Sequence, residues 1–251
     1  MDRPPRDVDI AVVGAGVAGL SAGLFLARQG REVAVLDRGT PWGDASGANA
    51  GTLSLQVKRI EVLELARFSI DLWERFKPEF GVDVGFGKVG GLRVATGEAE
   101  VSHMRAYSEE QAQHGFRFGW LDGNELRNLA PWLGPTVSAA TFCDYDSYVS
   151  PLLAGSAIIA AAAKAGARII GDAEVSGLRL ENGAYVLDTA KGSLRAKTLV
   201  IAAGPWSARI ARMLDVVFPF HVDVNMLSVT EPAPFVLDRV VTHIEGILSL
   251  K

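Results

Sequence analysis

The chain has 251 residues, a formal net charge of −4, and 29 acidic against 25 basic side chains. This length can bury one large core or two, and the nearly balanced charge excludes the basic field that nucleic acids follow. The single cysteine, Cys143, excludes an internal disulfide and a cysteine-rich metal site. It favours a reducing compartment, for which the cytoplasm is the default expectation.

Membrane and export signals are not expected. The N-terminal residues are polar, include two prolines and lead directly into an apolar strand, so we predict no signal peptide. The longest apolar stretch, residues 152–163, is too short to cross a bilayer. These patterns predict no transmembrane segment and leave peripheral membrane contact open.

A dinucleotide-binding unit is predicted over residues 8–37. The apolar run Ile10–Val13 is typical of a buried parallel strand, and a helical pattern follows it and stops at Gly30. Between them, Gly14 permits the tight turn, Gly16 lets the backbone approach a pyrophosphate, and Gly19 lets the helix pack close to the strand. Phosphates would lie at the N-terminus of this helix, where free amides and the helix dipole favour an anion.

A second buried strand, Val33–Leu36, ends at Asp37. A carboxylate at this position accepts hydrogen bonds from ribose hydroxyls and repels a 2′-phosphate. The order of these elements, namely strand, glycine motif, helix, strand and acid, is the order that a dinucleotide site requires. These residues alone do not decide whether the dinucleotide is FAD or NAD.

The middle of the chain changes character twice. Residues 38–51 form a loop of small residues and helix breakers, and residues 55–80 predict a long amphipathic helix with a core-facing stripe. The stripe consists of Leu65, Phe68, Leu72 and Phe76. From Val82 to Asp146 we expect antiparallel β-structure with inserted helices, beginning with a strand at Val82–Val84.

The last part returns to the first domain. A helix over 151–164 precedes strands at 167–170, 173–180, 184–189 and 193–197, with Asn182-Gly183 as a hairpin turn. Residues 198–203 form another buried strand that Gly204-Pro205-Trp206-Ser207 ends abruptly. Beyond it we predict a strand at His221–Thr230 and a hairpin of Val240–Ile244 with Ile247–Leu250.

Several separated stretches together resemble the FAD-dependent amino-acid and amine oxidoreductases of the D-amino acid oxidase type. Glycine oxidase, D-amino acid dehydrogenase and hydroxyproline dehydrogenase form the branch that it resembles most. The resemblance covers nearly all of the chain and depends on the glycine motif with Asp37, on residues 46–51, on residues 146–151, on Glu174-Val175 and on the stretch 202–207. The last stretch makes it more specific than the glycine motif alone.

The resemblance implies a set of FAD-binding residues. Residues 14–19 would hold the pyrophosphate, Asp37 the adenosine ribose, the loop 46–51 would wrap the phosphates, and Val175 would meet the adenine through its backbone. The full expected set is Gly14, Ala15, Gly16, Val17, Ala18, Gly19, Asp37, Arg38, Ser46, Asn49, Ala50, Gly51, Val175, Ala203, Gly204 and Trp206.

The resemblance also implies the architecture. We predict an α/β fold in which a Rossmann-like FAD-binding domain, residues 1–80 and 147–213, is interrupted by a mainly antiparallel α+β substrate domain, residues 81–146 and 214–251. Family members are longer, so the substrate domain is expected to be incomplete and the arginine that pairs with a substrate carboxylate is expected outside this sequence. Such a chain could be a fragment or one part of a split enzyme, and an unpaired sheet edge invites a partner subunit or a homo-oligomer.

The expected reaction moves a hydride from the carbon beside the nitrogen of a small amine or amino acid to the flavin. D-amino acid, glycine or sarcosine, and proline-type substrates are the preferred classes. The family does not require a side-chain acid or base, so no catalytic residue is assigned; His221 and His243, on predicted strands, are weak candidates. An NAD-dependent dehydrogenase and a non-catalytic subunit remain the alternatives, and no metal site is expected.

Overall fold

The computed structural model describes residues 4–231, 234–246 and 248–251. The chain forms two compact units: the first consists of Met1–Asn49 and Pro151–Leu227, and the second of Ala50–Ser150 and Ser228–Lys251. The predicted domain boundaries differ from these units, mainly because residues 50–80 group with the second. Leu63 and Ile70 pack there with Phe116 and Cys143 in one hydrophobic core.

The first unit is built on a six-stranded sheet with the order β10-β11-β12-β1-β2-β9. Strands β12, β1, β2 and β9 are parallel, as the buried apolar runs predicted, and β10, β11 and β12 form an antiparallel meander. The bounds are β1 Asp7–Val13, β2 Val33–Leu36, β9 Arg168–Ile170, β10 Val175–Glu181, β11 Ala184–Thr189 and β12 Gly192–Ile201. The prediction of two separate strands at 193–197 and 198–203 is wrong, because residues 193–201 lie in one continuous strand, β12, and residues 202 and 203 follow its end.

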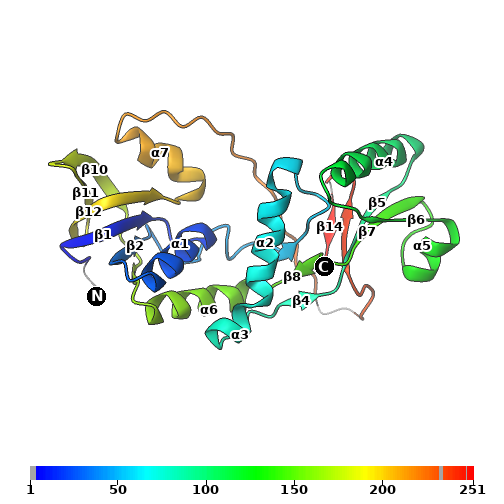
Figure 1. The fold of residues 1–251 in the computed structure, drawn as a ribbon, viewed down its shortest axis with the longest axis horizontal. Coiled ribbons are helices and arrows are strands. Elements are labelled where there is room, and N and C mark those ends of the chain that lie inside the picture. Colours follow the sequence, from blue (N-terminus) through cyan, green and yellow to red (C-terminus); the bar gives the residue numbers. More distant parts are fainter. Residues whose placement is uncertain (1–3, 232–233, 247) are drawn as a thin grey trace. The chain divides into compact units, whose positions relative to one another are not determined.

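Helices cover both faces of this sheet (Figure 1). On one face lie α1 (Val17–Arg28) and α6 (Pro151–Lys164), which pack against each other. A Cβ at Gly23 would come 2.7 Å from Val35, so this glycine lets α1 approach β2 closely. The other face carries a short 3₁₀-helix η2 (Gly204–Trp206) and α7 (Ser207–Arg212), whose Ile210 packs into the core with residues of β1 and β2.

Three strands of this sheet end at the same level. Val13 pairs with Leu36 on one side and with Ile201 on the other. The next residues continue the pairing, since Gly14 N–H donates to the Leu36 carbonyl at 2.7 Å and Ala202 N–H to the Val13 carbonyl at 2.8 Å. The loops after β1, β2 and β12 therefore meet at one edge, which is where α/β folds bind ligands.

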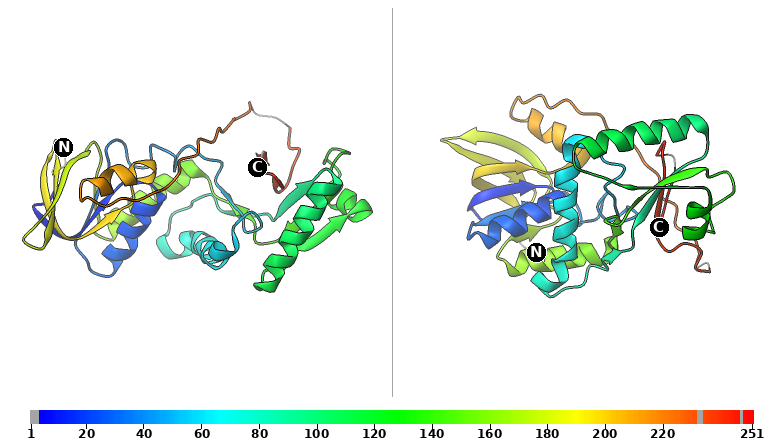
Figure 2. Two further views of the ribbon diagram at one scale, coloured as in Figure 1. Left: turned by 90° about the horizontal axis from the view of Figure 1, so that it is seen from above. Right: turned by 45° about the vertical axis from the view of Figure 1, so that its right-hand side comes forward.

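The second unit contains a five-stranded sheet, β14-β13-β5-β7-β6, and a small sheet, β3-β8-β4. All strand pairs are antiparallel except β13 with β5. Helix α4 packs on β5 and β7 (Figure 2). The bounds are β3 Thr52–Leu53, η1 Ile60–Val62, α2 Leu63–Glu74, α3 Phe76–Phe80, β4 Gly87–Lys88, β5 Gly91–Ala95, α4 Glu98–Gln113, β6 Gly119–Asp122, α5 Gly123–Leu129, β7 Ala139–Cys143, β8 Ser147–Tyr148, β13 Val240–His243 and β14 Ser249–Leu250.

The buried carboxylate of Asp146 connects the segment before β8 to the residues that follow β3. Asp146 is 1% exposed and accepts hydrogen bonds from the Leu55 amide (2.8 Å), the Ser54 hydroxyl (2.6 Å) and the Gln56 side chain (3.0 Å). Burial raises the pKa of this carboxyl above its usual value, and the three donors oppose that shift. Asp146 thereby fixes residues 54–56, which follow directly on β3.

The prediction of one continuous helix over residues 55–80 is wrong. It contains η1, α2 and α3, and the predicted stripe is only partly buried: Phe76 is in the core, but Leu65 is 64% and Phe68 55% exposed. The buried positions of α2 are Leu63 and Ile70 instead. Periodicity identified an amphipathic helix without fixing which apolar side chains face the core.

Two predicted strands are absent from the structure. Residues 82–84 have no strand pairing, and residues 221–230 pair with no strand in the described part of the chain. Apolar side chains of the second segment, such as Val224 and Met226, are more than nine-tenths exposed. An alternating pattern forms a strand only where a neighbour completes its backbone hydrogen bonds. The hairpin β13–β14 forms around Gly246 as predicted, although Ile247 lies outside the described residues.

Candidate functional site

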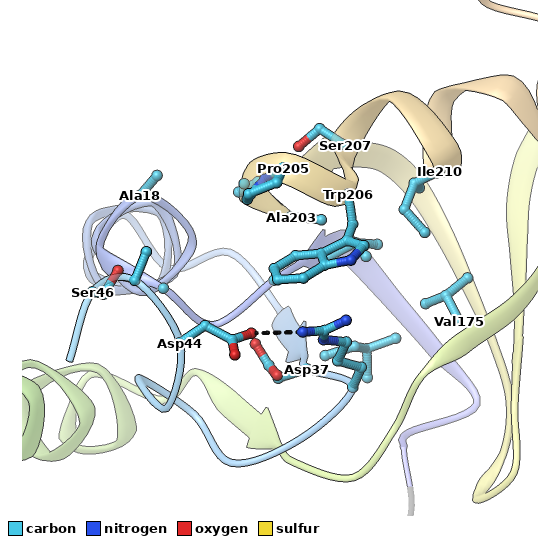
Figure 3. A pocket seen from close by; sticks show the side chains of 18 of the residues that line it. Ala18, Asp37, Asp44, Ser46, Val175, Ala203, Pro205, Trp206, Ser207 and Ile210 are labelled. Carbon is cyan, nitrogen blue, oxygen red and sulfur yellow. Dashed lines mark hydrogen bonds and ion pairs between the residues drawn. The ribbon is translucent and has the colours of Figure 1, made fainter. Parts of the chain in front are cut away.

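A cavity of about 390 Å³ lies in the first unit where the loops after β1, β2 and β12 meet (Figure 3). Its size falls at the lower end of ligand-binding pockets. The loop 42–46 and the residues before β10 complete its wall. The predicted residues that line it are Gly14, Gly16, Val17, Ala18, Asp37, Arg38, Ser46, Val175, Ala203, Gly204 and Trp206.

Gly14 and Gly16 are each required by the local structure, for different reasons. Gly14 has φ +106° and would bring a Cβ to 2.3 Å from the Ala202 carbonyl, so it both makes the turn and meets the end of β12. Gly16 precedes the first turn of α1, and a Cβ there would lie 3.0 Å from the Ser46 hydroxyl oxygen. That hydroxyl already accepts a hydrogen bond from Val17 N–H at 2.9 Å. A side chain at Gly16 would fill the space beside the helix N-terminus.

The Asp37 carboxylate accepts hydrogen bonds from the turn after β1 and from the turn after β2. Its Oδ2 accepts the Ala15 amide at 2.6 Å and its Oδ1 accepts the Gly39 amide at 2.9 Å. Its own backbone carbonyl accepts the Ala173 amide at 2.7 Å, which brings the start of β10 and Val175 to the same edge. The structure thus shows that Asp37 orders the glycine turn, while its role toward a ribose stays a prediction.

Arg38 and Trp206 form one wall of the cavity. The Arg38 guanidinium lies 3.4 Å from the centroid of the indole and makes an ion pair with Asp44 at 3.2 Å (Figure 3). A flat cation stacked on an indole presents π-surfaces that suit a planar ring. Trp206 is positioned by η2, which begins at Gly204 (φ +52°).

Five predicted residues do not line this cavity. Ala15 and Gly19 are buried, and a Cβ at Gly19 would come 1.8 Å from the Gly14 carbonyl, so Gly19 serves helix packing. The Asn49 side chain donates to the carbonyls of Ala45 and Ser46 and holds the loop. Ala50 and Gly51 belong to the second unit.

Sequence reasoning missed several wall residues. Trp42 lines the cavity and donates to the Pro151 carbonyl at 2.9 Å. Glu174 and Arg209 also line it and form an ion pair at 3.1 Å. The signal for Trp42 was a glycine inside the α6 helix, because a Cβ at Gly155 would come 2.4 Å from the indole. Glu174 belongs to the stretch Glu174-Val175 on which the family resemblance depends, but no role was predicted for its side chain, and Arg209 carries no local signal.

Neither histidine considered at the substrate side contributes to a described cavity. His243 Nε2 lies 3.2 Å from Glu100, and His221 Nε2 lies 3.2 Å from Asp223. Among the described residues, no group of three His, Cys, Asp or Glu side chains could hold a metal ion. No helix of that same part is long and apolar enough to span a bilayer.

A βαβ unit with a glycine turn, an acid after its second strand and a return strand at the same edge defines a dinucleotide-binding fold. The model of the family described as FAD dependent oxidoreductase matches residues 9–245, and the chain belongs to this family. FAD is therefore the cofactor of its family, and the predicted α/β fold class is confirmed.

The similar proteins support the same family. The chain is 30% identical to the glycine oxidase of Geobacillus kaustophilus over 90% of its own residues and 62% of that protein. The crystal structure of that organism's glycine oxidase superposes with a TM-score of 0.82 at 29% identity, over 95% of this chain and 66% of the other. One of the polypeptides of the opine oxidase of Rhizobium meliloti is 27% identical over 90% of this chain and 64% of its own length. The chain thus spans a little under two thirds of these relatives.

Proposed function

We propose that this chain binds FAD in the cavity of the first unit and takes part in oxidising the C–N bond of a small amine or amino acid. The observation that carries the proposal is the bare backbone at Gly16, which lines the cavity beside the N-terminus of α1. A Cβ added there would lie 3.0 Å from the Ser46 hydroxyl oxygen and would fill this space. A pyrophosphate needs such a backbone surface without side chains.

The remaining predicted residues fit the other parts of the cofactor. Gly14, Gly16, Val17 and Ala18 would face the pyrophosphate. Asp37 would accept a ribose hydroxyl with the lone pairs that its two amide donors leave free. Val175 and the stacked pair of Arg38 and Trp206 would flank the adenine. Ala203 and Gly204 would lie beside the cofactor at the end of β12, and the loop of Ser46, Asn49, Ala50 and Gly51 would lead toward the flavin.

In this proposal the first unit is the FAD-binding domain and the second is the substrate domain. FAD, when bound, supplies the acceptor for a hydride. The chain's task is to hold the substrate so that the C–H bond beside nitrogen faces that acceptor; the resulting imine is then hydrolysed by water.

The substrate class and the partners that we propose are based on the names of the relatives. One relative is a glycine oxidase and another is a subunit of an opine oxidase, so we propose a small amino acid or secondary amine as substrate and a partner subunit or a second copy as a possible completion of the site. The cytoplasmic location, predicted from the single cysteine, stays a prediction.

Anaerobic reduction tests the function. The purified chain is loaded with FAD and titrated with glycine, sarcosine, D-alanine and D-proline while the visible absorption of the flavin and reduction of a dye are recorded. Bleaching by any of these compounds supports the proposal. Retained FAD that none of them reduces supports the non-catalytic alternative, and thermal stabilisation by NAD instead of FAD would favour the dehydrogenase alternative.

A further inference from the structure

Residues 217–231 run as an extended coil after α7 and belong to no strand (Figure 1). In the described part of the chain, none of their backbone N–H or carbonyl groups bonds to another backbone group. We infer that residues 218–226, which lie wholly within the first unit, form an antiparallel two-stranded ribbon with the same residues of a second copy of this chain. This inference goes beyond the proposed function and does not depend on FAD.

Apolar side chains occupy every second position of this segment. They are Phe218, Phe220, Val222, Val224 and Met226, and each is at least 40% exposed. The rings of Phe218 and Phe220 lie 5.7 Å apart, measured between their centroids, so these alternate side chains share one side of the chain. In a strand all five side chains would lie on one face. An exposed apolar face on a backbone with unpaired groups is typical of a strand that pairs with another chain.

The other face of the segment carries one imidazole and one carboxylate. His221 Nε2 lies 3.2 Å from Asp223 Oδ1, and both side chains are more than three quarters exposed. In an antiparallel ribbon whose twofold axis passes through Val222, His221 lies opposite Asp223 of the second copy, and Asp223 lies opposite the second copy's His221. An imidazole and a carboxylate in such a cross-strand pair form a hydrogen bond or, when the imidazole is protonated, an ion pair. The polar face of the segment is therefore complementary to itself.

The same register also matches the apolar side chains. With the axis at Val222, Phe220 lies opposite Val224 of the second copy. An axis at Asp223 sets two carboxylates opposite each other, an axis at His221 sets each Asp223 opposite a proline, and an axis at Val224 sets Phe220 opposite a serine. A shift by one residue sets apolar side chains against the polar face of the partner strand. Of these registers only the axis at Val222 satisfies both faces, so a second copy is the partner that the segment fits.

Pro219 determines which residues form the backbone hydrogen bonds of the ribbon. In an antiparallel pair every second residue exchanges both backbone hydrogen bonds with the residue opposite, and the residues between them direct their N–H and carbonyl groups outward. Pro219 has no N–H to donate, so it fits only an outward position. The hydrogen bonds therefore connect the even-numbered residues of 218–226, and Val222 pairs with Val222 of the second copy across the axis.

The ribbon is expected to be weak and reversible. Each cross-strand pair contributes little, and an isolated pair of strands is only marginally stable in water. We therefore expect the full chain to be monomeric at low concentration and increasingly dimeric at high concentration. Sedimentation velocity over a hundredfold range of protein concentration measures this equilibrium. A chain that stays monomeric over the whole range overturns the inference.

Disulfide trapping tests the register. Val222→Cys places two thiols across the axis on Cα atoms about 5.5 Å apart, a separation that a disulfide spans. In Val224→Cys the two thiols lie four residues apart along the ribbon, about 13 Å, which a disulfide does not span. Both variants replace an exposed valine, and the native Cys143 is buried. Under mild oxidation Val222→Cys should form a covalent dimer and Val224→Cys should form little; equal cross-linking of the two overturns the inference.

Exchange of the charges tests the cross-strand pairs. His221→Asp sets two carboxylates opposite each other and should weaken association about fivefold or more. Adding Asp223→Lys to it reverses each pair and should restore the association of the parent chain. Glu231→Lys changes the charge by the same amount outside the ribbon and should leave association unchanged.

A double variant that associates as weakly as His221→Asp, or an equal loss in Glu231→Lys, overturns the inference. All these positions are exposed, so circular dichroism of each variant should match that of the parent chain. Because none of these measurements needs FAD, their failure leaves the cofactor proposal untouched, and failure of FAD retention leaves their result standing.

Discussion

Replacement of Gly16 by alanine separates cofactor binding from folding. The backbone at Gly16 has φ −80°, which alanine adopts freely, and the only close neighbour of the added methyl is the Ser46 hydroxyl oxygen at 3.0 Å. The serine must give by a few tenths of an ångström and at worst loses its hydrogen bond from Val17 N–H. One such bond contributes about 0.5–1.5 kcal/mol. For a chain of this size the melting temperature should fall by no more than about 6 °C.

The affinity for FAD should change much more. The methyl would occupy the space where the pyrophosphate meets the backbone, and the loss of one charge-assisted hydrogen bond costs about 1.5–3 kcal/mol. Since about 1.4 kcal/mol is a factor of ten, binding should weaken about 10- to 100-fold. Equilibrium titration followed by flavin fluorescence measures the affinity, and scanning fluorimetry measures the stability.

Gly39→Ala is the matched control for this variant. Gly39 lies in the same unit, does not line the cavity, and has open space where a Cβ would be. It should leave the affinity unchanged. An unaltered FAD affinity in Gly16→Ala, or an equal loss in both variants, would refute the position given to the pyrophosphate.

Three further predictions follow from the same structure. Gly19→Ala should abolish the cooperative thermal transition seen in the parent chain, because its Cβ would lie 1.8 Å from the Gly14 carbonyl oxygen; a transition within a few degrees of the parent would contradict the packing of α1 on β1. Trp206→Phe should remove much of the tryptophan quenching that FAD causes, because Trp206 stacks on Arg38 in the cavity wall; emission titrations with Trp73→Phe as control decide this, since Trp73 does not line the cavity. Burial raises the pKa of Asp146 in the folded chain, so the native state holds this proton more tightly than the unfolded state, and the free energy of unfolding should fall as pH rises through the raised pKa. In Asp146→Asn this dependence on pH should be weaker. Urea unfolding of both chains between about pH 4 and 7 measures it, and parallel profiles would contradict the assignment.

The dinucleotide unit could be predicted closely because its signals are local. Each glycine of the motif has a backbone reason that spacing alone reveals, and the apolar run 33–36 is the strand β2 without a change of bounds. The Asn182-Gly183 turn is equally local, with φ +50° and +75° at the two residues. Such features depend on residues that are neighbours in sequence.

The remaining features depend on distant parts of the chain. Leu65 was expected in the core, yet the second unit buries Leu63 and Ile70 and leaves Leu65 at a cavity. The alternation of residues 221–230 indicates a strand, but only a partner strand can complete it. Trp42 and Glu174 reach the cavity because α6 and β9 return to the edge of β1 and β2, an arrangement that composition and periodicity do not specify.

The central claim is that the first unit holds FAD, and the visible absorption spectrum of the purified chain tests it most directly. The chain is incubated with excess FAD, desalted and measured, with Gly16→Ala treated in parallel. We predict that the parent chain retains the flavin absorption band and that the variant retains much less. A parent chain that is folded by circular dichroism and keeps no flavin would contradict the claim that this cavity is a sufficient FAD site.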